Sequence, residues 1–88
     1  MANLPETLGL KDAAAVLQDL RSQMRGESGA QIVIDVAALR HFDSSALAVL
    51  LDCKREAARL QKSFLLKSAP PKLLALADLY GVRELLGT

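Results

Sequence analysis

The chain has 88 residues, enough for one small domain and too few for a second, catalytic one. Eleven basic residues balance ten acidic ones, leaving a formal net charge of +1 spread along the chain. Nucleic-acid binding usually needs a basic face or stacked aromatic side chains, so this charge balance and an aromatic content of 3% exclude nucleic acid as the expected partner.

The first two predicted elements are an extended segment and an amphipathic helix. Residues 4–10, interrupted by Pro5, suit an edge strand or an extended lead-in. From residue 11 to about residue 25, apolar side chains recur at spacings of three and four, which predicts a helix. Two glycines in residues 26–29 end this helix, because glycine lets the chain reverse without steric cost.

The middle of the chain predicts a central strand followed by a long helix. Residues 31–36 are β-branched and almost continuously apolar, which is typical of a strand covered on both faces and therefore central in a sheet. A linker follows over residues 37–43. The apolar residues of 44–60 then fall on one broad stripe, so a second helix is expected to pack against that sheet.

The last third predicts a strand over residues 63–67 and a helix over residues 71–79 with proline in its first turn. Gly81 ends this helix, and residues 82–86 add a last turn. Strands and helices therefore alternate along the chain. This order predicts an α/β fold with right-handed crossovers, built as a single domain over residues 1–88.

Cysteine usage and the length of the apolar runs bear on the compartment. Cys53 is the single cysteine and forms no internal disulfide, which favours a cytosolic protein. Residues 1–10 lack the basic start and apolar centre of a signal peptide. The longest uncharged apolar stretch, residues 44–51, is far short of the roughly 20 residues that span a bilayer. We therefore expect a partner to provide any membrane association.

The most informative segment, Phe42-Asp43-Ser44-Ser45-Ala46-Leu47, lies at the start of the second predicted helix. Two interpretations are open. Asp and Ser are preferred helix N-caps, so these side chains could serve the helix start alone. A surface hydroxyl here would also suit docking or phosphorylation, because added negative charge is favoured at a helix N-terminus.

Catalytic and metal sites find little support in the sequence. His41 lies close to Asp43 and Ser44, but neighbours along one loop rarely converge as a catalytic triad, and no oxyanion loop is visible. Cys53 lies on the apolar stripe and is interpreted as a small buried residue. One cysteine and one histidine do not suffice for a metal site, and the glycines lack phosphate-binding spacing. We expect neither catalysis nor a metal or cofactor.

Several runs resemble the core signature of STAS domains, the fold of anti-sigma-factor antagonists and of the cytosolic tails of sulfate transporters. The runs are Ile32-Val33-Ile34-Asp35-Val36, then Phe42 to Leu51, then Leu65 to Pro71 and Leu76-Ala77-Asp78-Leu79-Tyr80-Gly81-Val82. Two departures stand out. Ala46 replaces a glycine that many relatives have, and the first strand before residues 4–10 is missing.

Within the family, the last of these patterns on so short a chain is most similar to the small STAS subunits of phospholipid ABC transporters. That resemblance implies a non-catalytic subunit that binds the transporter's ATPase, supports its assembly or activity in intermembrane phospholipid transport, and reaches the inner membrane from the cytoplasm through this partner. Other members imply an alternative, an anti-sigma-factor antagonist that binds an anti-sigma factor and is switched by a serine kinase.

The resemblance makes Ser44 the functional residue. It matches the phosphorylated serine of the sigma-regulating members and a threonine at the ATPase contact of the transporter subunits, and Asp43 and Ser45 flank it. The outer face of the same helix is interpreted either as a solvated face or as an interface strip; its residues are Ala48, Asp52, Arg55 and Arg59. Tyr80 and Leu79, at the end of the third predicted helix, suit either the core or the apolar centre of that interface.

Overall fold

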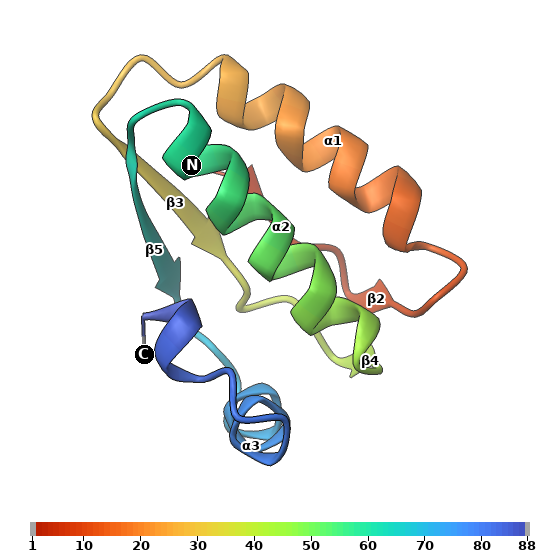
Figure 1. Cartoon of the computed structure of the whole chain (residues 1–88). Coiled ribbons are helices and arrows are strands. Elements are labelled where there is room, and N and C mark those ends of the chain that lie inside the picture. Colours follow the sequence, from red (N-terminus) through yellow and green to blue (C-terminus); the bar gives the residue numbers. More distant parts are fainter. Residues whose placement is uncertain (1, 88) are drawn as a thin grey trace.

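A computed structural model describes residues 2–87; Met1 and Thr88, the ends of the predicted domain, lie outside the described residues. A parallel three-stranded sheet forms its base (Figure 1). The strands are β1 (Ala2–Asn3), β3 (Gln31–Asp35) and β5 (Ser63–Lys67), in the order β1-β3-β5. The predicted α/β class and the central position of the 31–36 strand are confirmed.

The two faces of this sheet differ in their cover. Ile32 and Ile34 are buried, and they are in register with Phe64 and Leu66 on the face beneath the helices. Val33 pairs with Leu65 on the opposite face, where Leu65 is 43% exposed. The prediction that both faces are covered is therefore wrong: successive side chains alternate, and among residues 2–87 the helices α1 and α2 lie over one face only.

Helices α1 (Ala13–Arg25) and α2 (Ser45–Arg59) lie side by side on the covered face, within one or two residues of their predicted bounds (Figure 1). Each contributes its apolar stripe to one core. From α1 this stripe buries Leu20 and Met24. The fully buried aliphatic side chains of α2 face them, as expected for amphipathic helices that pack on a sheet.

The N-terminal segment shows that the first strand, predicted to be short or missing, is present and short. Ala2–Asn3 forms the edge strand β1 beside β3, so the sheet is closed by residues before the 4–10 segment. Residues 4–10 instead contribute β2 (Thr7–Leu8), which pairs in parallel with β4 (His41–Phe42) in a separate two-stranded ladder. Residues 37–43, predicted as a linker, therefore contain a strand, but two residues are too short to give a periodic signal in the sequence.

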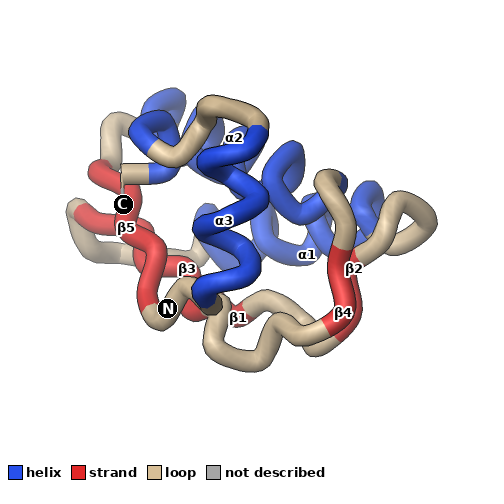
Figure 2. The backbone as a smooth tube through the Cα atoms, turned by 90° about the horizontal axis from the view of Figure 1, so that it is seen from below, coloured by secondary structure: helices blue, strands red, loops and turns tan. Residues whose placement is uncertain are grey.

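Helix α3 (Pro71–Leu79) and the short 3₁₀ helix η1 (Glu84–Leu86) complete the chain with the bounds expected. Gly81 follows α3 with a φ of +68°, a left-handed conformation that suits glycine and ends the helix. Helix α3 lies at the end of the molecule where β3 and β5 terminate (Figure 1), and Figure 2 looks at the molecule from that end, with α3 in front. The start of α2 lies at this same end.

Candidate partner-binding site

A single carboxylate organises the start of α2. Asp43 Oδ1 accepts a hydrogen bond from the Ser45 N–H at 2.8 Å, and Asp43 Oδ2 accepts one from the Leu10 N–H at 3.2 Å. The bond from the Ser45 N–H, with smaller contributions from the Ser45 hydroxyl and the Leu10 N–H, lowers the pKa of Asp43 below its ordinary value. Asp43 thus provides the capping bond and ties the N-terminal segment to α2.

Ser44 stands at the N-cap position but makes no side-chain capping bond. Its side chain is exposed, and within residues 2–87 its hydroxyl has no hydrogen-bond partner. Of the two interpretations of this segment, the capping role therefore falls to Asp43. The Ser44 hydroxyl stays free to contact another molecule.

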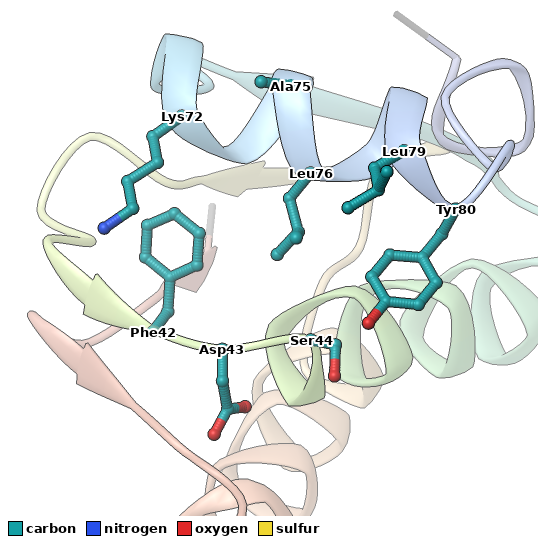
Figure 3. Close-up of a pocket in the computed structure, with 8 residues that line it drawn as sticks. All are labelled: Phe42, Asp43, Ser44, Lys72, Ala75, Leu76, Leu79 and Tyr80. Atoms are coloured by element: carbon teal, nitrogen blue, oxygen red, sulfur yellow. The ribbon is translucent and has the colours of Figure 1, made fainter.

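A groove of about 490 Å³ separates α3 from the start of α2 (Figure 3). Leu76 and Leu79 point into it from α3, and Phe42 with Lys72 lies at one end. At the other end Tyr80 leans from the end of α3 toward α2, so it does not lie in the core but is 57% exposed. The remaining lining residues are Asp43, Ser44 and Ala75. The groove therefore unites the neighbours Asp43 and Ser44 with Tyr80, which is distant from them in sequence.

The predicted strip on α2 runs away from Ser44 along the same face. At 100° per residue, its positions from Ser44 to Arg59 fall within an arc of about 80°. The strip members Ala48, Arg55 and Arg59 are exposed, and Asp52 is half-buried. Arg55 donates to Asp52 at 2.7 Å on the surface. Ser45 is half-buried, with its N–H bonded to Asp43.

Arg59 differs from the other strip residues because its guanidinium pairs with Glu56. The Glu56 side chain is only 8% exposed and also lies 3.8 Å from Arg21 Nε of α1. The hydrogen bond from Arg59 is the main cause that lowers the pKa of Glu56. Sequence periodicity places Glu56 off the apolar stripe and gives no sign of this burial. Glu56, which pairs with Arg59 within α2, is therefore the residue that also contacts α1.

Cys53 and His41 do not belong to the groove. Cys53 is fully buried, and burial raises the pKa of its thiol to about 12, so it is a packing residue at neutral pH. His41 is exposed on β4 and does not line the groove. Among the described residues, no three His, Cys, Asp or Glu side chains gather as metal ligands.

Several groove residues were missed by sequence reasoning, namely Phe42, Lys72, Ala75 and Leu76. A signal for those on α3 exists. Leu73 and Ala77, four residues apart, form the buried face of α3, whereas positions 72, 75, 76 and 79 form a second helical stripe. When a short helix has apolar residues on two faces, the core can bury only one of them, and the other stays available for a partner.

Comparison with known protein families shows the family to which this chain belongs. A family profile described as "Mlab, STAS domain" matches residues 3–87. The chain belongs to the STAS domain family. Within it, a curated relative from Haemophilus influenzae, named intermembrane phospholipid transport system binding protein MlaB, is 40% identical over 50 residues. The match covers 57% of this STAS chain and about half of the relative's length, 48%.

None of the helices within residues 2–87 has both the length and the apolar character needed to cross a bilayer.

Proposed function

We propose that this chain is the MlaB-type STAS subunit of a phospholipid ABC transporter and that it binds the transporter's ATPase, an MlaF-like protein, from the cytosolic side. The likeness to a protein named for an intermembrane phospholipid transport system supports this role. The subunit has no catalytic task. Its contact with the inner membrane is indirect and runs through the ATPase.

The observation that carries the proposal is the free Ser44 hydroxyl beside an apolar groove. Ser44 is exposed and unbonded within residues 2–87, and Leu79 and Tyr80 line the same groove with 78% and 57% of their surfaces exposed. Protein interfaces commonly combine such an apolar, aromatic centre with a polar rim. The α2 strip extends this surface through Ala48 and Arg55.

Binding to one conformation of the ATPase is the proposed mechanism. A subunit that binds one conformation more tightly than the others stabilises it by the difference in binding free energy. The STAS chain therefore supports assembly or activity of the transporter without chemistry of its own.

Replacement of Ser44 by glutamate tests the proposal. Ser44→Glu adds bulk and charge at the centre of the proposed contact, so we expect the complex with the co-expressed ATPase to weaken by roughly tenfold or more. The matched control is Ser22→Glu on the exposed surface of α1. Thermal unfolding of both variants verifies the fold. An undiminished complex with Ser44→Glu, next to a stable wild-type complex, contradicts the proposal.

A second candidate function rests on the same free hydroxyl. As an anti-sigma-factor antagonist, the chain would be phosphorylated at Ser44, and the added charge of about −1.5 to −2 would repel its partner. The intact mass of the chain purified from its native cells separates the two functions. A phosphate at Ser44 favours the antagonist, and an unmodified chain that co-purifies with the ATPase favours the transporter subunit.

A further inference from the structure

The groove between α3 and α2 contains two charged side chains, Asp43 and Lys72, and they differ in how they are satisfied. Both Asp43 oxygens accept backbone hydrogen bonds, and the carboxylate points away from α3 (Figure 3). Asp43 is therefore committed to the start of α2. Its charge is not directed into the groove.

Lys72 has no such partner. Its ammonium lies 5.6 Å from the centroid of the Phe42 ring, a cation–π contact, and among residues 2–87 it makes no ion pair. Exposed contacts of this kind are weak, so most of the charge remains available. Lys72 also lies in the first turn of α3, where the helix dipole disfavours a positive charge. The position of Lys72 therefore does not stabilise the helix to which it belongs.

Apart from Ser44 and the Tyr80 hydroxyl, the rest of the groove lining is apolar. Leu76 and Leu79 point into it, and the Leu79 side chain, 78% exposed, has little contact with the chain's own core. A surface of this kind is complementary to a segment that carries apolar side chains along its length and one carboxylate at the Lys72 end. A lipid headgroup is a poorer match, because its negative charge would approach a single lysine with no further cation lining the groove.

We infer that the groove is the docking site for a segment of the partner ATPase that is apolar along Leu76 and Leu79 and places an Asp or Glu carboxylate beside Lys72. This inference rests on the proposed function and adds the chemistry of the partner's segment. The carboxylate would pair with an ammonium already held over the Phe42 ring, so that charge complementarity fixes the direction in which the segment lies.

Titration of the purified ATPase subunit with chain variants tests the Lys72 contact. We expect Lys72→Gln to weaken binding roughly two- to fivefold, as for an exposed charge pair, and Lys72→Glu to weaken it by about tenfold or more through repulsion. Wild-type affinity should fall as salt increases, and Lys72→Gln should reduce that dependence. The matched control, Lys67→Gln, removes an exposed lysine outside the groove and should bind as the wild type does.

A cross-link identifies the occupant. Because Cys53 is buried, Ala75→Cys supplies the accessible thiol for a photoreactive maleimide at a position that lines the groove. The expected product joins the chain to an ATPase peptide that contains apolar residues and an Asp or Glu. Replacement of that acidic residue by lysine should restore binding to Lys72→Glu.

The outcomes separate the inference from the proposed function. If the wild-type chain forms no complex with the ATPase, the proposed function fails. If the complex forms but Lys72→Glu binds as tightly as the wild type, or the cross-linked peptide lacks a carboxylate, the inference alone fails. A cross-link to a second copy of the chain, or equal capture by phosphatidylglycerol vesicles, also overturns it.

Discussion

At the scale of single residues, Asp43 has the widest influence on the candidate site. Its carboxylate bonds the first turn of α2 and the N-terminal segment at Leu10, 33 residues away in the chain. These two bonds fix the backbone that presents Ser44. The side chain that sequence reasoning treated as a flanking contact is thus the one that positions its neighbour.

Replacement of Asp43 by alanine should lower the thermal midpoint at neutral pH. Its pKa in the folded chain lies below the ordinary value of 3.8, so the folded chain takes up this proton less readily than the unfolded chain. The stabilisation by Asp43 is therefore present above that value and lost as the pH falls through the lowered pKa. Unfolding curves of wild type and Asp43→Ala should converge in acid.

Asp19→Ala serves as the control for this prediction, since the Asp19 carboxylate accepts a surface bond from Gln23 within the same helix. A midpoint difference between wild type and Asp43→Ala that stays constant down to strongly acidic pH would show that the ionised carboxylate is not what stabilises the fold.

At the scale of secondary-structure elements, α3 combines two tasks on two faces. Leu73 and Ala77 are fully buried and attach the helix to the core. Leu79, at the end of the same helix, is 78% exposed in the groove. Stability and the proposed partner binding therefore involve different side chains of one nine-residue helix, which makes them separable by mutation.

Leu73→Ala should mainly lower stability, whereas Leu79→Ala should mainly weaken binding of the ATPase. Loss of the buried Leu73 side chain leaves a cavity and is expected to cost about 2–5 kcal/mol of unfolding free energy. Leu79→Ala should change stability by less than about 0.5 kcal/mol but weaken ATPase binding by about tenfold. Denaturant unfolding and binding titrations measure the two effects. A large stability loss in Leu79→Ala would place that side chain in the core instead.

Most elements could be predicted from the sequence because they are long enough to show a period. The helices α1, α2 and α3 and the strands β3 and β5 all lie close to their predicted bounds. The ladder between β2 and β4 could not be predicted, since two residues per strand carry no alternation and their pairing joins positions 34 residues apart. The partly exposed face of the sheet could not be predicted either, because the nearly continuous apolar run of residues 31–36 indicates cover on both faces.

The candidate site could be predicted only in part. Asp43 and Ser44 were chosen as polar residues at a helix start, with the family resemblance singling out Ser44, and Tyr80 as an aromatic with a polar tip. The groove that unites them arises from the way α3 lies at the end of the sheet. Lys72 and Leu79 belong to that groove, but only tertiary structure brings Lys72 to the Phe42 ring. The contact of Glu56 with Arg21 likewise depends on the packing of α1 against α2.

At the scale of the whole molecule, the chain is small and its expected stability is modest, roughly 4 to 13 kcal/mol at the usual value per residue. One face of its sheet is only partly covered, and the edge strand β1 has two residues. A bound partner would therefore make a large relative difference to the population of the folded state.

Binding of the ATPase should stabilise the whole chain. At a partner concentration about one hundred times the Kd, the free energy of unfolding should rise by roughly 2.7 kcal/mol. Hydrogen exchange followed by mass spectrometry can measure this effect, because it resolves the two proteins. The slowest-exchanging amides of the core strands should gain clearly more protection in wild type than in Ser44→Glu at the same partner concentration. Protection that is equal in both would argue against a contact at Ser44.

The parallel order of β1, β3 and β5 affects where related chains can differ in sequence without a change of fold. Because all three strands end at the same edge, the segments that follow them gather there, beside α3 and the start of α2. Leu4, Val36 and Leu39 in these exit segments belong to the core, but the exposed positions beside them can change while the packed interior stays the same. Related chains could thus acquire different partners by exchanging a few loop and helix-end residues, with the fold itself left untouched.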